Sequence, residues 1–174
     1  MSLFLIESSL LNIANSKQDV DQKASELQSL FEEKEAALIE LQVSKDFSRA
    51  FYIVEAANKE VATNILQEAG ISIELVKDVR LVGDELDKVK QQKDIVNYLV
   101  EWNIPEDITM DQYLARKKKN SVHYEEVPEV SFARTYVCED MSKCLCFYDA
   151  PDEAAVIRAR DAVSTPIDSI TELG

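Results

Sequence analysis

The stretch Leu5-Ile6-Glu7 decides the fold, because a close counterpart, Leu99-Val100-Glu101, follows 94 positions later. Further residues match at the same offset without a gap: Val43 with Val137, Asp46 with Asp140, Ser48 with Ser142, Glu55-Ala56 with Asp149-Ala150, and Ile73 with Ile167. A repeat of about 80 residues is a whole small domain, since solenoid units span only about 20–50 residues. The sequence therefore predicts two similar domains in tandem.

The first copy predicts the order strand, helix, strand, strand, helix, strand. The predicted strands cover residues 3–9, 37–44, 49–55 and 72–82, and the first helix covers 16–35 with apolar side chains at helical spacing. Asn58 is a typical helix-capping residue, and Gly70 is typical of a helix end, so a second helix is expected between them.

The second copy predicts the same order. Strands are expected at 94–102, 130–138, 143–148 and 167–173, with one helix opened by the capping box Thr109 to Gln112 and another capped by Asp152. We predict a first domain at 1–82, a charged and partly helical connector at 83–93, and a second domain at 94–174. This βαββαβ order is the ferredoxin-like fold of the α+β class, in which both helices cover one face of the sheet.

Alternation along the strands predicts which side chains face away from the helices. Leu145 and Phe147, with Phe51 and Ile53 in the first copy, are the larger apolar set and are placed under the helices. The opposite, open face then carries Cys144, Cys146 and Tyr148 from the third strand, which match Ala50, Tyr52 and Val54 of the first copy. The second strand adds Phe132, Arg134, Tyr136 and Cys138 to this face. The first strand adds Asn97, Leu99 and Glu101, and Leu5 and Glu7 are the matching residues of the first copy.

Two apolar open faces in one chain are expected to cover each other. Exposed apolar patches of that size are hazardous for a protein in water, and two sheets pack about 10 Å apart. We therefore predict a monomer with internal pseudo-two-fold symmetry, an α+β sandwich or barrel that resembles a fused homodimer. A small-molecule ligand is expected between the two sheets.

Composition limits the classes of partner. A net charge of −14 repels phosphate backbones and anionic lipid, so nucleic acid and membranes are not expected partners. The basic run at 116–119 is interpreted as a solvated helix face. No signal sequence and no run of membrane-spanning length is evident, so the predicted location is cytoplasmic. With 3 glycines in the chain, phosphate-cradling loops are not expected, and no cofactor is predicted.

Four stretches of the second copy resemble a small bacterial family of ferredoxin-like domains without a known function, some of whose members are described as nickel-binding. They are Tyr98-Leu-Val-Glu101, Ile108-Thr-Met-Asp-Gln112, Lys143-Cys-Leu-Cys-Phe-Tyr-Asp-Ala-Pro151 and Thr165-Pro-Ile-Asp-Ser-Ile170. The resemblance covers about residues 95–174, and its most specific part is the pattern Cys146, Tyr148, Ala150, Pro151. The first copy has Tyr52-Ile-Val-Glu-Ala-Ala57 there and is similar to a diverged member.

The resemblance implies the ferredoxin-like fold and offers nickel binding as an alternative function. Family members often carry a histidine in the second helix, where this chain has Ala159, and the only histidine is His123. Nickel and zinc are usually bound by several imidazole or thiolate ligands. We therefore predict no stoichiometric transition-metal site.

Six residues are predicted to contact a ligand: Glu101, Arg134, Tyr136, Cys146, Tyr148 and Glu7. Glu101 and Glu7 occupy equivalent strand positions, where a carboxylate needs a partner such as Arg134 or Tyr136. These carboxylates either hold the domains together or anchor a ligand and transfer protons. The cysteines either fill the core or act in metal or redox chemistry. His123 is expected at the surface, and Trp102 is expected to pack in the core.

Several functions are compatible with the sequence. The first is a small-ligand-binding module. The second is a cofactor-independent enzyme of the dimeric α+β barrel kind, an isomerase or oxygenase in which Glu101, Arg134 or Tyr148 acts as acid, base or anchor. A scaffolding role is a third possibility, and the nickel binding implied by the resemblance is a fourth.

Overall fold

The computed structural model describes residues 2–10, 16–82, 86–91 and 96–174. The chain divides into two compact units, residues 1–79 with Gly174, and residues 80–173. Parts of the predicted connector at 83–93, and the predicted strand start at 94, lie outside the described residues.

The first unit has the predicted order of elements. It contains β1 (Ser2–Ser9), α1 (Lys17–Glu33), β2 (Ala37–Val43), β3 (Arg49–Ala56), α2 (Lys59–Glu68) and β4 (Ile73–Val82), whose last residues belong to the second unit. The strands lie antiparallel in the order β2-β3-β1-β4. The side chain of Asn58 caps α2 as predicted, and Gly70 follows the helix with a φ of 81°.

The second unit repeats this order and arrangement. It contains α3 (Leu86–Gln91), β5 (Tyr98–Asn103), α4 (Met110–Asn120), a 3-10 helix (Ser121–Glu126), β6 (Ser131–Cys138), β7 (Lys143–Asp149), α5 (Glu153–Ala162) and β8 (Ser169–Glu172). Its strands are antiparallel in the order β6-β7-β5-β8. The capping box at Thr109 and the cap at Asp152 are both formed. The predicted α+β fold class with ferredoxin-like units is confirmed.

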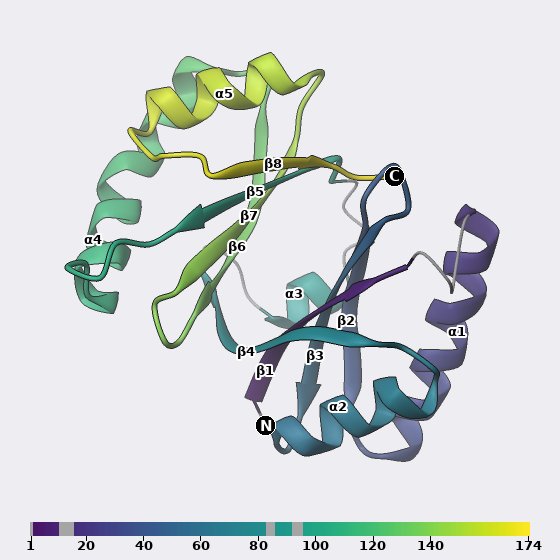
Figure 1. Cartoon of the computed structure of the whole chain (residues 1–174). Coiled ribbons are helices and arrows are strands. Elements are labelled where there is room, and N and C mark those ends of the chain that lie inside the picture. Colours follow the sequence, from purple (N-terminus) through teal and green to yellow (C-terminus); the bar gives the residue numbers. More distant parts are fainter. Residues whose placement is uncertain (1, 11–15, 83–85, 92–95) are drawn as a thin grey trace. The chain divides into compact units, whose positions relative to one another are not determined.

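In each unit both helices cover the same face of the sheet (Figure 1). Leu27 and Phe31 of α1 and Leu66 of α2 pack on the sheet of the first unit, where they meet Ile6 and Tyr52. Burying a side chain of this size stabilises a fold by about 1.5–3 kcal/mol. In the second unit, α4 and α5 cover the strands that carry the site described below.

The predicted orientation of β3 and β7 is wrong. Cys144, Cys146 and Tyr148 lie under the helices of the second unit, in one cluster with Val156 and Ala159 of α5. Ala50, Tyr52 and Val54 do the same in the first unit. The prediction placed the larger apolar set under the helices, but both faces of these strands are buried, so side-chain size does not distinguish them.

Strand register explains the correct orientation. Residues directly opposite each other in an antiparallel pair point to the same face. Leu99 is paired with Phe147, and Glu101 is paired with Leu145. Because Leu99 and Glu101 face away from the helices as predicted, Leu145 and Phe147 must do so too.

A β-bulge corrects the predicted position of Phe132. The register of β6 against β7 shifts between Phe132 and Arg134, so residues on the two sides of the shift do not follow simple alternation. Phe132 therefore lies on the helix-covered face and stacks on Tyr124 with ring centroids 5.2 Å apart.

Among the described residues, none of the helices is both long and apolar enough to cross a membrane.

Candidate functional site

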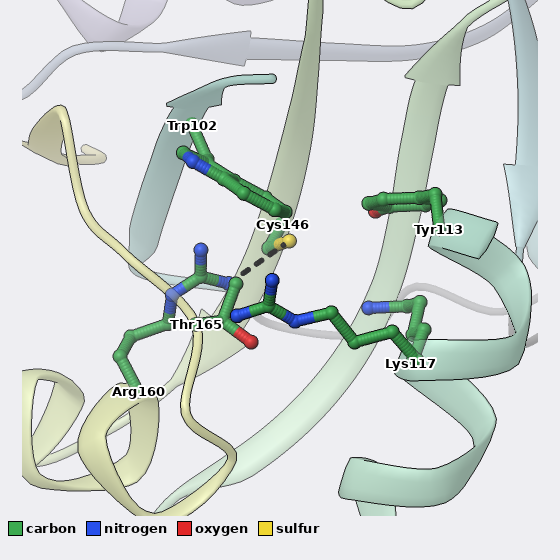
Figure 2. Close-up of a pocket in the computed structure, with 7 residues that line it drawn as sticks. Trp102, Tyr113, Lys117, Cys146, Arg160 and Thr165 are labelled. Carbon is green, nitrogen blue, oxygen red and sulfur yellow. Dashed lines mark hydrogen bonds between the residues drawn. The ribbon is translucent and has the colours of Figure 1, made fainter. Parts of the chain in front are cut away.

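A pocket opens on the helix-covered face of the second unit (Figure 2). Its volume is about 270 Å³, including the part open to solvent. Strands β5 and β7, helices α4 and α5 and the segment after α5 supply its walls, which are Trp102, Tyr113, Arg116, Lys117, Cys146, Arg160 and Thr165. Three of these seven residues are cationic and none is acidic, in a chain whose net charge is −14.

Arg160 is the deepest charged group of the pocket. It follows Ala155, Val156 and Ala159 on the buried side of α5, and its side chain is only 1% exposed. Its Nη1 donates to the sulfur of Cys146 at 3.3 Å and to the hydroxyl of Tyr148 at 3.1 Å, and Nη2 donates to the carbonyl of Pro166 at 2.6 Å. Its Nε is buried and has no hydrogen-bond partner.

In the part of the chain that the structure describes, no carboxylate pairs with Arg160. A buried charge normally requires an opposite charge and a full set of hydrogen bonds. In the first unit the corresponding position, eight residues after the cap of α2, holds Leu66. The fold itself therefore does not require a cation at this place.

Cys146 is the ionisable acidic group in direct contact with the guanidinium of Arg160. Its sulfur also accepts a hydrogen bond from the hydroxyl of Thr135 at 3.3 Å. The hydrogen bond from the Cys144 thiol lowers the pKa of Cys146 well below its usual range. Burial alone would raise this pKa, whereas the positive charges of Lys117 and Arg160 lower it further. The same hydrogen bond, together with burial, raises the pKa of Cys144. Of the two cysteines, Cys146 is therefore the one that forms a thiolate at the lower pH.

A pair of tyrosines lies next to the guanidinium of Arg160. The hydroxyls of Tyr148 and Tyr124 lie 2.6 Å apart, and that of Tyr148 accepts a hydrogen bond from Arg160. Burial raises the pKa of Tyr148, and it raises the pKa of Tyr124 to about 12. Both side chains are therefore neutral phenols at neutral pH and supply hydrogen bonds but no negative charge to Arg160.

Aromatic and cationic side chains form the outer part of the pocket. The guanidinium of Arg116 lies 5.3 Å from the centre of the Trp102 ring, and the Tyr113 ring lies 6.1 Å from that of Trp102. Arg116 and Lys117 are half-buried and line the pocket, whereas Lys118 and Lys119 are exposed. The interpretation of residues 116–119 as a solvated face is therefore wrong for the first two.

The six predicted site residues do not come together as one site. Glu101 faces away from the helices, where its carboxylate accepts a hydrogen bond from Nζ of Lys143 at 2.8 Å. Arg134 and Tyr136 lie on the same face of the sheet and pack on the Phe147 ring, at 5.7 and 6.1 Å. Cys146 and Tyr148 lie on the opposite, helix-covered face with Arg160.

Glu7 belongs to the first unit. It is paired with Nη2 of Arg49 at 2.7 Å, so each predicted carboxylate has a cation at the start of the third strand of its own unit. The sequence pattern suggests Arg134 or Tyr136 as partners and gives no sign of Arg49 or Lys143, because the pairing of strands brings these cations to the carboxylates.

Sequence reasoning missed the deepest residue of the pocket. The apolar spacing of Ala155, Val156 and Ala159 after the Asp152 cap indicates a buried helix face, and Arg160 continues that face. That signal was available in the sequence. Trp102 was predicted to pack in the core, and it does, but one side of it also lines the pocket.

The second unit matches a known protein family. Residues 98–173 match the family model described as nickel responsive protein SCO4226-like. The similarity to this family therefore lies within the second unit. The SCO4226 structure from Streptomyces coelicolor A3(2) is 18% identical with a TM-score of 0.38, and the match covers 44% of this chain and 93% of that chain.

Two other solved structures resemble the whole chain. A candidate chlorite dismutase, TA0507, is 14% identical with a TM-score of 0.57, and the match covers 100% of this chain and 95% of that chain. A candidate monooxygenase from Lactobacillus acidophilus NCFM is 12% identical with a TM-score of 0.53, and the match covers 100% and 94%. At these identities the likeness shows the fold alone. No curated protein sequence matches this chain.

The SCO4226-like family is described by its response to nickel, so the donor set of this chain matters. The described residues contain no group of three or more His, Cys, Asp or Glu side chains placed to hold a metal ion. Cys144 and Cys146 share one face of β7, but the sulfur of Cys146 already accepts a hydrogen bond from the guanidinium of Arg160. The positive charge of that guanidinium would repel a metal cation. His123 is exposed and contacts Glu126. These residues do not fit a nickel ion.

Proposed function

We propose that the second unit is a small-ligand-binding module that holds a small organic anion in the pocket formed around Arg160. One observation carries the proposal: a guanidinium that is 1% exposed has no carboxylate partner among the described residues and keeps an unpaired Nε. An anion entering the pocket would supply the missing acceptor and would offset the excess positive charge of Arg116, Lys117 and Arg160. Charge-assisted hydrogen bonds of this kind are about twice as strong as neutral ones.

The pocket walls indicate the chemical class of the ligand. Arginine recognises carboxylates through its planar fork of donors, and Arg116 adds a second guanidinium nearer the opening. Trp102 and Tyr113 offer ring surfaces for a flat apolar part of the ligand. Much of the space of about 270 Å³ is open to solvent, so the pocket suits a small ligand whose apolar part lies partly at the surface. A small carboxylate with an apolar body fits these features best.

The single tryptophan of the chain makes the proposal testable. Trp102 lines the pocket, so its fluorescence reports on the site without a label. We expect benzoate, titrated at constant ionic strength, to give a saturable change, and benzamide, which has a similar shape without the charge, to give none. Equal responses to the two compounds would show that charge does not select the ligand and would contradict the proposal.

Two variants of the same helix distinguish the effect of a cation in the pocket wall from the general effect of positive charge on the protein surface. Arg116→Gln removes a cation of the pocket wall, and Lys118→Gln removes an exposed cation of the same helix. We expect the first to weaken benzoate binding by about tenfold, the size of one charge-assisted hydrogen bond, and the second to leave it nearly unchanged.

A further inference from the structure

The sulfur of Cys146 has the surroundings of a nucleophile. It receives hydrogen bonds from Thr135 and Arg160, both at 3.3 Å, so donors point at the sulfur from two directions. Donors around a sulfur stabilise its negative charge, and the thiolate is the nucleophilic form of cysteine. In the first unit the corresponding strand position holds Tyr52, so this chemistry is confined to the second unit.

The same sulfur forms part of the pocket wall. In Figure 2, Cys146 lies between Trp102 and Tyr113 on one side and the cationic groups on the other. An anion in the pocket that binds Arg160 also lies near the sulfur, because both residues line the pocket and Nη1 of the same guanidinium contacts Sγ (Figure 2). Holding two reacting groups together in this way accelerates their reaction strongly.

We propose that Cys146 is a nucleophile that forms a thioether with small organic anions carrying an electrophilic carbon, after they have docked against Arg160 and Arg116. This inference rests on the proposed anion binding and extends it to covalent capture. In the reaction, a lone pair of the sulfur forms the new carbon–sulfur bond. The bond from that carbon to its leaving atom breaks, and the leaving group departs with the electron pair. No external oxidant or reductant is needed.

Alkylation of the full-length protein tests this with two matched probes. Iodoacetate carries a carboxylate and an electrophilic carbon, and iodoacetamide is its neutral counterpart; each loses iodide when sulfur attacks. Peptide mass spectrometry resolves the modification at each cysteine. We expect the rate ratio of iodoacetate to iodoacetamide at Cys146 to exceed the ratio for the same residue in the urea-unfolded chain by about tenfold.

Variants assign the effect to the pocket. Arg116→Gln should lower the iodoacetate rate at Cys146 with little change for iodoacetamide, and Lys118→Gln should leave both rates unchanged. Cys138→Ser serves as a second control, because Cys138 is buried but is not one of the residues lining the pocket. Cys146→Ser should remove the fast-reacting site.

The outcomes distinguish this inference from the proposed function. If neither reagent modifies Cys146 faster than the unfolded chain while Trp102 still reports benzoate binding, the nucleophile is wrong and the anion site stands. If Cys146 reacts quickly with both reagents but without preference for iodoacetate, the anion site is wrong, and with it the docking step proposed here.

Discussion

The guanidinium of Arg160 donates a hydrogen bond from Nη1 to the sulfur of Cys146 across 3.3 Å of buried space. The two residues come from α5 and β7, and ionisation of Cys146, whose pKa is lowered, makes them a charge pair with a thiolate in the place usually held by a carboxylate. Lys117 adds positive charge near the same sulfur. The pocket therefore keeps a net positive charge even with the thiolate formed, and that excess is the basis of anion binding.

The first prediction concerns the pH dependence of cysteine reactivity. A free thiol has a pKa near 8.5, so its alkylation rate falls about tenfold for each pH unit below that value. The pKa of Cys146 is lowered by the hydrogen bond from Cys144 and by nearby cations, so its rate with iodoacetamide should stay level as the pH falls below about 8.

Cys138 provides the internal comparison for that experiment. Burial raises the pKa of Cys138, so its rate should still be increasing above about pH 9. Site-resolved mass spectrometry measures both cysteines in one sample. Parallel pH profiles for Cys138 and Cys146 would contradict the thiolate assignment.

The second prediction concerns Tyr148. Its hydroxyl accepts a hydrogen bond from Arg160, so Tyr148→Phe leaves one guanidinium donor with fewer acceptors. An unsatisfied buried polar group costs about 1–3 kcal/mol, and we expect the free energy of unfolding to fall by that amount. Urea denaturation measures it. Saturating benzoate should restore part of the loss in Tyr148→Phe, whereas a purely structural hydroxyl would give no such rescue.

The third prediction concerns the ion pair between Glu101 and Lys143. The two side chains are only 9% and 15% exposed, so Lys143→Met leaves a nearly buried carboxylate without its cation. The expected loss is about 3 kcal/mol in the free energy of unfolding. The double variant Glu101→Gln with Lys143→Met should recover most of it. Additive losses in the double variant would show that the two groups act independently.

Arg49→Met in the first unit is the matched comparison. Arg49 pairs with Glu7 in the same strand positions, but its side chain is 40% exposed. Solvent screens such a pair, so the loss should be about 1 kcal/mol or less.

The fourth prediction concerns nickel. The described residues offer no cluster of three metal ligands, and a tight site needs three or four converging donors. We expect calorimetric titration with nickel, in a buffer that does not chelate it, to show no one-to-one binding below the micromolar range. Tight binding that is abolished by Cys146→Ser or His123→Ala would contradict this prediction and favour the behaviour for which the family is described.

The fold was predictable because its signals are local. The caps at Asn58, Thr109 and Asp152 and the spacing of apolar residues each mark one element, and the order of elements limits the topology. The orientation of β7 was not predictable from its composition, since Cys144 and Leu145 are both fully buried. Only the pairing of Glu101 with Leu145 decides which of them lies under the helices.

The site was less predictable than the fold. Cys146 and Tyr148 are among the predicted residues, but alternation alone places them on the wrong face and groups them with Glu101. Arg160 was missed because an arginine near a helix end is usually exposed, and its neighbour Arg158 does lie at the surface. What distinguishes the two arginines is their angle around α5 relative to Ala155, Val156 and Ala159.

Replacing Arg160 with the residue that the first unit has at this position tests the central claim most directly. Arg160→Leu removes the donor to Cys146, Tyr148 and the Pro166 carbonyl, so we expect this variant to fold and to melt several degrees below the wild type. The measurement is thermal unfolding with and without benzoate. We predict that benzoate raises the melting temperature of the wild type and leaves that of Arg160→Leu unchanged. An equal rise in both proteins would contradict the account, because the ligand would then not depend on the buried guanidinium.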